Sequence, residues 1–201
     1  MLFRSRSHLA RELHDELGAL LTSSKLDVAR LKSRLGVLTP AVAERIQHLT
    51  VGLNSGIALK RRIIEDLRPS SLSNLGLVAA LEILVREWGE RSEIKVDSDF
   101  QPVQLLPSAE LTVYRLVQEA LTNISKYAQA SEVQVRLSAD EGRVLVTVRD
   151  NGIGFDVDAP QLSAHGLLGM RYRLETDGGT LLLKSSAGGG TVIEAHLPES
   201  P

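Results

Sequence analysis

The chain contains no cysteine among its 201 residues, which excludes disulfides, cysteine-ligated zinc and thiol catalysis. Aromatic residues make up only 3% of the sequence, so a surface on which nucleic-acid bases stack is not expected. The formal net charge of −2 provides no excess of positive charge to attract a phosphate backbone. These shortages together predict that nucleic acid is not a partner.

Long hydrophobic runs are also missing. No stretch approaches the roughly 20 apolar residues that a membrane-spanning helix requires. Residues 1–10 include basic side chains but lack the apolar segment of a signal peptide. We therefore expect a soluble, cytoplasmic chain that makes no membrane contact of its own.

The first third of the chain has the hydrophobic periodicity of two long helices. Apolar residues recur at spacings of three and four over residues 9–35 and again over residues 42–67. Gly36 is expected to cap the first helix, with Pro40 just beyond the break. Two such helices form an antiparallel hairpin that cannot cover its own apolar stripe, so a dimeric four-helix bundle is the simplest solution.

Pro69 ends the helical zone, because proline removes a hydrogen-bond donor and clashes with the preceding turn. We place a domain boundary here, which gives domains of residues 1–70 and 71–201. The second domain mixes helices with mainly antiparallel strands, which predicts an α+β two-layer sandwich. Helices are expected at residues 77–91, 107–127 and 167–177, and strands at residues 94–96, 132–139, 143–149, 180–185 and 191–197.

An acid and two glycines follow one of these strands. The strand at residues 143–149 alternates valines with polar or small residues and delivers Asp150 to an edge of the sheet. Gly152 and Gly154 then permit a sharp turn and a close approach to something flat. A buried carboxylate here could accept a hydrogen bond from an exocyclic amine such as that of adenine. A plain tight turn is the alternative.

A histidine lies on the first predicted helix. His14 follows an apolar residue of the stripe, so it is expected at the stripe's edge, partly exposed. A neutral imidazole is a good nucleophile near pH 7, and the neighbouring Asp15 could hold its tautomer or take its proton. An ordinary surface histidine in a charged helix is the alternative.

A second helix carries a carboxylate, an amide and a lysine on neighbouring turns. Glu119 and Asn123 are four residues apart and so share a face, and Lys126 comes three residues later. Carboxylate and amide oxygens suit Mg²⁺, which usually keeps waters and substrate phosphates in its shell. Lys126 could then meet phosphate charge. The alternative is an ordinary solvated helix face.

Glycines also open the last predicted helix, in the run from His165 to Arg171. Gly166 and Gly169 leave free N–H groups at the positive end of the helix dipole, a place suited to phosphates. The preceding residues 157–164 are small or polar and are expected to form a mobile lid. A glycine-rich loop before a helix is the alternative.

Along the chain the four motifs follow one another as His14, Glu119 with Asn123, Asp150, and Gly166 with Gly169. With the motifs in this order, the chain closely resembles the two-component sensor histidine kinases. More narrowly, it is similar to the subgroup with a short ATP lid whose partners are NarL/LuxR-type response regulators. The resemblance runs from about His8 to Pro198 and includes residues 66–69, residues 75–81 and the closing Gly190-Thr191. It implies a helical dimerisation and phosphotransfer hairpin followed by a Bergerat-type ATP-binding sandwich.

The same resemblance implies roles for single residues, with ATP and Mg²⁺ as cofactors. His14 would be the phosphoacceptor and Asp15 its acid–base neighbour. Asn123 would be the Mg²⁺ ligand, with Glu119 beside it and Lys126 near the phosphates. The remaining expected ATP-binding residues, from the adenine end to the lid, are Asp150, Gly152, Gly154, Thr191, Gly166, Leu167, Gly169 and Met170.

One departure from the family pattern concerns Ala19. The acid after the histidine usually begins an Asp-x-x-x-Gln pattern, and its glutamine is associated with the water that dephosphorylates the regulator. Alanine cannot orient water, so phosphatase activity is expected to be weak. A second departure is Tyr127, where histidine is more common, and we draw nothing from it.

The expected reaction moves the γ-phosphoryl of ATP to His14 and then to an aspartate of a separate regulator. Two alternatives stay open: a Bergerat-fold serine kinase or ATPase in which His14 is incidental, and a catalytically silent dimeric scaffold that binds nucleotide or a partner helix. No sensing module precedes His8, which predicts either a catalytic fragment of a longer parent or a kinase controlled by another protein. Membrane attachment of such a parent stays open.

Overall fold

The computed structural model describes residues 16–67, 69–157 and 165–200. The chain divides into two compact units, Met1–Ser70 and Ser71–Pro201. Among the described residues, no helix combines the length and the apolar character that crossing a membrane requires.

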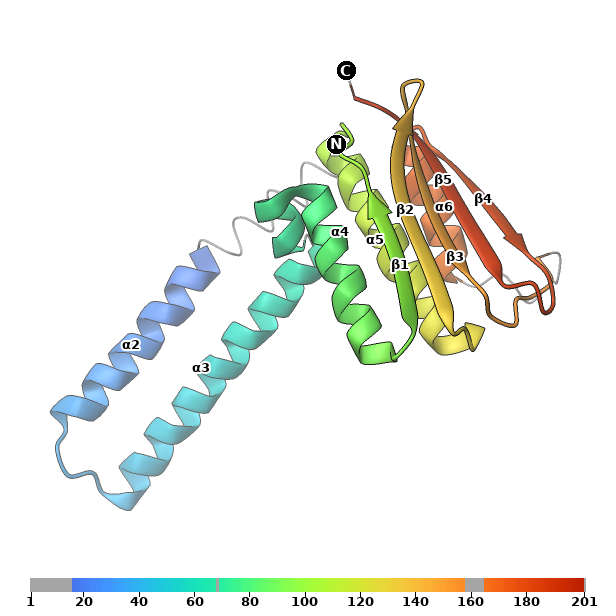
Figure 1. Cartoon of the computed structure of the whole chain (residues 1–201). Helices are drawn as coiled ribbons and strands as arrows, with labels where there is room; N and C mark the ends of the chain where they lie inside the picture. The colour runs from blue at the N-terminus through green and yellow to red at the C-terminus, as the bar shows by residue number, and fades with distance from the viewer. Residues whose placement is uncertain (1–15, 68, 158–164, 201) are drawn as a thin grey trace. The chain divides into compact units, whose positions relative to one another are not determined.

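The first unit is a hairpin of two helices, α2 (Gly18–Arg34) and α3 (Pro40–Leu67), as shown in Figure 1. α2 ends as expected, because Leu35 caps it and Gly36 takes a left-handed φ of +64°. Proline at the first position of α3 is favourable, since its fixed φ suits the helix and no N–H is lost there. The predicted hairpin is thus confirmed.

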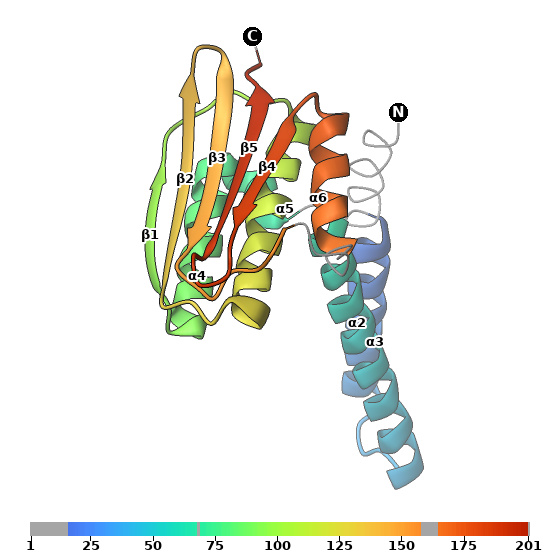
Figure 2. The ribbon, with the colours of Figure 1, turned by 90° about the vertical axis from the view of Figure 1, so that its right-hand side faces the viewer.

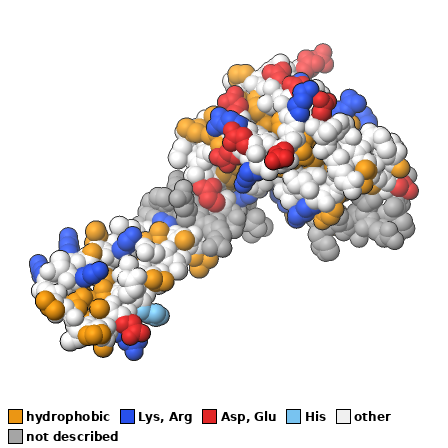
Figure 3. Space-filling view, turned by 60° about the horizontal axis from the view of Figure 1, so that its bottom comes forward, with side chains coloured by type: hydrophobic (Ala, Val, Ile, Leu, Met, Phe, Trp, Pro, Cys, Tyr) orange, Lys and Arg blue, Asp and Glu red, His pale blue; other side chains and the backbone are white. Residues whose placement is uncertain are grey.

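The hairpin leaves much of its apolar surface uncovered. No residue of α2 is buried within one copy of the chain. The side chains of Leu20, Leu31 and Leu49 are 62%, 57% and 54% exposed. Figure 3 shows hydrophobic side chains gathered along the hairpin between charged ones. An exposed apolar surface of this kind is typical of a protein interaction site.

The second unit is an α+β sandwich, so the predicted fold class is confirmed. Its helices and strands, in chain order, are α4 (Ser70–Ser92), β1 (Lys95–Phe100), α5 (Pro107–Asn123), the π-helix η2 (Ile124–Ala128), β2 (Glu132–Asp140), β3 (Arg143–Asp150), α6 (His165–Thr176), β4 (Thr180–Ser185) and β5 (Thr191–Pro198). α4 is interrupted at Gly76, which has a φ of 80° and a ψ of 176°.

The five strands form one sheet in the order β1-β2-β3-β5-β4. β1 runs parallel to β2, and the other pairings are antiparallel. Helices α4, α5 and α6 cover one face of the sheet (Figures 1 and 2). Alternate residues of β2 and β3 point into the core between helices and sheet, as the period of two predicts.

The end of α5 differs from the prediction of one continuous helix over residues 107–127. The α-helix stops at Asn123, and the next turn widens into η2 and ends at Gln129, which has a φ of 51°. In this turn the Ser125 hydroxyl lies 2.8 Å from the Trp88 indole nitrogen, which donates a hydrogen bond to it. Apolar spacing does not reveal such a turn, because its side chains still follow a helical pattern.

Candidate functional site

A cavity of about 520 Å³ opens in the second unit, where α5, η2, the turn after β3, the start of α6, and strands β4 and β5 meet. Eight of the residues singled out from the sequence line it: Glu119, Asn123, Lys126, Asp150, Gly154, Gly166, Leu167 and Thr191. Residues from three of the four sequence motifs therefore line the same cavity.

Asp150 ends β3 in the wall of this cavity and is 5% exposed. The Gly152 backbone N–H donates a 2.8 Å hydrogen bond to its Oδ1, and Thr191 donates from its backbone and its hydroxyl. Burial raises the pKa of the Asp150 carboxyl above its ordinary value, and these hydrogen bonds oppose the rise. Because a carboxylate has about four acceptor sites, three donors leave room for one donor from a ligand.

A hydroxyl network holds the loop beside Asp150. Ser185 Oγ accepts a 2.9 Å hydrogen bond from the Phe155 backbone N–H and donates one of 2.8 Å to the Gly190 carbonyl. It also lies 3.1 Å from Thr191 Oγ1. Ser185 was not predicted as a site residue. Ser185 ends β4 and Thr191 begins β5, and the two residues pair in register across this hairpin.

Two glycines of the turn are required by close backbone contacts. A Cβ on Gly152 would lie 2.2 Å from the Ala128 carbonyl oxygen. A Cβ on Gly154, which has a φ of +59°, would lie 2.0 Å from the Ser186 carbonyl oxygen. Gly152 is buried and is not part of the cavity lining, so its role here is close packing behind the wall.

Replacing Gly154 by alanine is expected to destabilise the fold more than the same change at Gly142. Both glycines have a left-handed backbone conformation, with φ of +59° at Gly154 and +77° at Gly142, so alanine at either position costs roughly 1–2 kcal/mol of backbone strain. Nothing lies within 4 Å of a Cβ on Gly142, whereas Gly154 must also displace backbone, at roughly 1–3 kcal/mol more. Denaturant unfolding measures the difference, and equal losses for the two variants would contradict the observed contacts.

The part of the cavity formed by the end of α5 and by η2 carries the oxygen donors and a cation, and we call it the donor end. Glu119 and Asn123 lie one helical turn apart on α5, and Lys126 follows on η2. Among the described residues, no group of three or more His, Cys, Asp or Glu could hold a metal alone. The donors present suit Mg²⁺ arriving with phosphates, since that ion uses one or two protein ligands and otherwise phosphate and water.

The start of α6 closes this end. Gly166 and Leu167 line the cavity, and a Cβ on Gly166 would lie 2.5 Å from Glu119 Oε1. Gly169 and Met170 are not among the lining residues. Met170 is 1% exposed and belongs to the hydrophobic core of the second unit, so it contributes to packing and not to the cavity lining.

The other lining residues were not predicted as site residues from the sequence. They are Ala120, Ile124, Tyr127, Ala128, Val148, Phe155, Leu183 and Ile193. They provide the apolar walls that a flat ring requires. Strand alternation could have found the three strand members, because each points inward beside the end of its strand.

The expected phosphoacceptor and its acidic neighbour lie outside the described residues. Neither His14 nor Asp15 is part of the structure described here, and the same holds for residues 158–164, most of the predicted lid. Ala19 is described and is exposed on α2.

Comparison with known proteins assigns both units. Residues 5–72 match the family described as histidine kinase. Residues 108–201 match the family described as histidine kinase-, DNA gyrase B- and HSP90-like ATPase.

Curated relatives align over nearly the whole chain. The sensor histidine kinase MctS of Rhizobium johnstonii is 39% identical over 97% of this chain and 43% of its own length. The histidine-protein kinase/phosphatase DegS of Brevibacillus brevis is 34% identical over 96% of this chain and 51% of its own. The nitrate/nitrite sensor protein NarX of Escherichia coli is 31% identical over 99% of this chain and 34% of its own length. The chain thus spans about half the length of such relatives, or less.

Solved structures share the fold. The histidine kinase domain of the blue-light activated kinase of Erythrobacter litoralis EL346 aligns with a TM-score of 0.57 at 19% identity, over 90% of this chain and 94% of that one. The histidine kinase AdeS of Acinetobacter baumannii aligns with a TM-score of 0.52 at 14% identity, over 90% of this chain and 98% of that one. With both family matches and these relatives, the chain belongs to the sensor histidine kinases and carries their catalytic core.

Proposed function

We propose that this chain transfers the γ-phosphoryl group of Mg–ATP to His14 and then to an aspartate of a NarL/LuxR-type response regulator. Residues 1–70 serve dimerisation and phosphotransfer, and residues 71–201 bind ATP. One observation carries the proposal: buried Asp150 and the oxygen donor Asn123 line the same cavity, in a chain whose residues 5–72 match the histidine kinase family. The reaction takes place in the cytoplasm, where ATP is available.

The adenine end of the nucleotide lies at Asp150. The carboxylate accepts a hydrogen bond from the exocyclic amine, and the glycine turn lets the ring lie against the backbone. Apolar walls such as those of Phe155 and Ile193 cover the ring faces. The phosphates extend toward Lys126 and the N–H groups that open α6.

Transfer to His14 requires positioning and charge neutralisation more than covalent help, because phosphoryl transfer passes through a loose transition state. Mg²⁺ beside Asn123 neutralises charge on the phosphate oxygens when it is bound with ATP. One ring nitrogen of His14 forms a bond to phosphorus as the bond to the β-phosphate oxygen breaks, which releases ADP. Asp15 accepts the ring proton. The regulator's carboxylate then displaces the histidine from phosphorus.

We assign the hairpin to a homodimer. The absence of any buried residue in α2 and the exposed leucines of both helices support a partner that covers this surface. A second hairpin of the same chain would complete a four-helix bundle.

The proposal is tested by incubating the chain with γ-labelled ATP and Mg²⁺ and examining the bound phosphate. Phosphohistidine is labile in acid and stable in base, so the label should be lost in acid and retained in base. A purified NarL-type receiver domain should then remove it from the chain. Acid-stable label would indicate a serine kinase, and absence of label despite nucleotide binding would indicate a silent scaffold. Either result would overturn the proposal.

Replacement of Ala19 by glutamine is expected to raise dephosphorylation of the regulator about 10-fold or more, because a positioned polar group can orient the attacking water. DegS is named a kinase/phosphatase, and we propose that this chain departs from such dual activity through Ala19. The side chain is exposed, so the change should not disturb packing. Phosphoregulator decay measures the effect, with Ala19→Met as a control of similar length. Equal decay rates with both variants would refute the role given to Ala19.

A further inference from the structure

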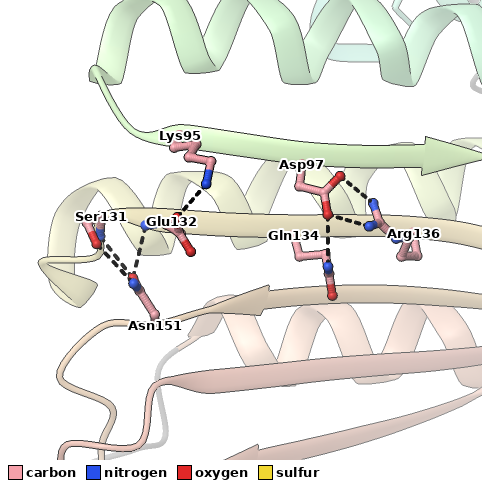
Figure 4. Close-up of polar contacts among 7 residues, drawn as sticks. All are labelled: Lys95, Asp97, Ser131, Glu132, Gln134, Arg136 and Asn151. Carbon is pink, nitrogen blue, oxygen red and sulfur yellow. Dashed lines mark hydrogen bonds and ion pairs between the residues drawn. The ribbon is translucent and has the colours of Figure 1, made fainter.

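The residue after Asp150 points its side chain toward the start of β2. Asn151 Oδ1 accepts hydrogen bonds from the backbone N–H groups of Ser131, at 2.9 Å, and Glu132, at 3.0 Å. Its Nδ2 donates a 2.9 Å hydrogen bond to Ser131 Oγ. Figure 4 shows the three contacts fanning from one amide to the segment that begins β2. The side chain thus joins the turn after β3 to the start of β2, about 20 residues earlier in the sequence.

The backbone of the same turn is attached to the same segment. The Asn151 N–H donates to the Glu132 carbonyl at 3.3 Å, and the Ile153 N–H donates to the Ala128 carbonyl at 2.8 Å. Ala128 ends η2, the turn that carries Lys126 to the cavity. The turn after β3 is therefore held to η2 and to the start of β2 by both side-chain and main-chain hydrogen bonds.

This attachment reaches the Asp150 carboxylate through one of its three hydrogen-bond donors. The Gly152 N–H that binds Asp150 Oδ1 belongs to the turn that Asn151 anchors. If the anchor is lost, Gly152 can shift and the carboxylate loses a donor that orients it. Asn151 itself is exposed and is not among the residues lining the 520 Å³ cavity, so it has no contact with a ligand there.

We infer that Asn151 is a positioning residue for nucleotide recognition, and that through Asp150 it contributes to the choice of adenine over guanine nucleotides. The inference rests on the proposed ATP-binding function. Adenine presents an amine that a fixed carboxylate accepts, whereas guanine presents a carbonyl oxygen at the same ring position and is repelled. A carboxylate that moves can avoid the carbonyl, so discrimination should fall together with affinity.

Three variants of the full chain separate the parts of the anchor. Asn151→Ala removes all three side-chain hydrogen bonds. Asn151→Asp keeps an acceptor for both backbone N–H groups and loses only the donation to Ser131. Ser131→Ala also loses that donation, without any change of charge. Each variant is measured for the Kd of Mg–ATP and Mg–GTP, for the KM and kcat of autophosphorylation, and for thermal stability.

For Asn151→Ala, we expect the Kd and KM for ATP to rise about 10-fold, the ATP-to-GTP preference to fall several-fold, and kcat to change less than 2-fold. Asn151→Asp and Ser131→Ala should stay within about 2-fold of the wild type at physiological salt, which screens the exposed new charge. Failure of the wild type to bind ATP would refute the proposed function and this inference with it.

Two results would overturn the positioning role while ATP binding by the wild type stands. One is a lower melting temperature for Asn151→Ala with an unchanged ATP-to-GTP preference, which would show a structural role alone. The other is equal impairment of Asn151→Ala and Asn151→Asp, which would show that accepting the two N–H hydrogen bonds is not the relevant property.

Discussion

Replacing His14 by glutamine is expected to abolish acid-labile labelling from γ-labelled ATP while leaving the Kd for Mg–ATP unchanged. Glutamine keeps a polar side chain of similar reach but has no nucleophilic ring nitrogen, so no phosphoramidate bond can form. ATP binding should persist because the residues that line the cavity all belong to the second unit.

The control for this variant is His48→Gln, which changes an exposed histidine of α3 in the same hairpin. It should be labelled as strongly as the wild type. Label of equal strength on His14→Gln and wild type would exclude His14 as the phosphoacceptor. Loss of label from both variants would point to damage of the hairpin and not to loss of one acceptor.

Asp150→Asn is expected to weaken Mg–ATP binding by about 10- to 100-fold and to reduce autophosphorylation at limiting ATP. A hydrogen bond to a charged group contributes roughly 1.5–3 kcal/mol, and each 1.4 kcal/mol is a tenfold change in Kd. The amide nitrogen would also face donors, because Gly152 and Thr191 already donate to this side chain. Isothermal titration calorimetry measures the change.

Asp140→Asn is the matched control for this variant. Asp140 is an exposed aspartate at the end of the β2–β3 hairpin opposite to Asp150, so the control should keep the wild-type Kd. An Asp150→Asn variant that binds ATP within about 2-fold of the wild type would exclude the carboxylate as the adenine acceptor.

The same carboxyl should make ATP binding depend on pH. Because burial raises the pKa of Asp150, its charged form is lost at a higher pH than for an ordinary carboxyl, and ATP affinity should fall as the pH drops through the raised pKa. Folding stability should move the other way. The raised pKa means that the folded state favours protonated Asp150. The contribution of this group to the free energy of unfolding is therefore present at acid pH and is lost as the pH rises through that pKa. The Asp150→Asn variant removes this component from both profiles and separates it from titration of ATP itself.

Local chemistry explains how much of the fold was predictable. The hairpin followed from spacings of three and four, from Gly36 and from Pro40, and each of these acts within one turn of chain. The strands followed from alternation, and four of the five have bounds within one residue of the expected ones. β1 is longer than expected, since it runs from Lys95 to Phe100 and not over residues 94–96. The parallel pairing of β1 with β2 was not predicted, since pairing direction depends on how α5 crosses over and not on either strand alone.

The site residues were predictable where several residue types combine in a pattern that suits ligand binding. An acid followed by two spaced glycines at a strand end is one such pattern, and a carboxylate and an amide on one helix face is another. From these patterns Asp150, Gly154, Glu119 and Asn123 line the cavity. Ser185 and Asn151 were missed because a serine or an asparagine near a turn is common. Their partners, Phe155 and Ser131, lie 30 and 20 residues away.

The sequence by itself determined the two helices, the strand that delivers Asp150, and the order of motifs that places the chain among the sensor histidine kinases. Only the tertiary structure decided which glycines pack against backbone and which face the cavity, and that Met170 belongs to the core. The reason is physical. Helical and strand periodicity act over a few residues, whereas the walls of the cavity come from the order β3-β5-β4 and the helices packed on that sheet, which bring distant residues into register.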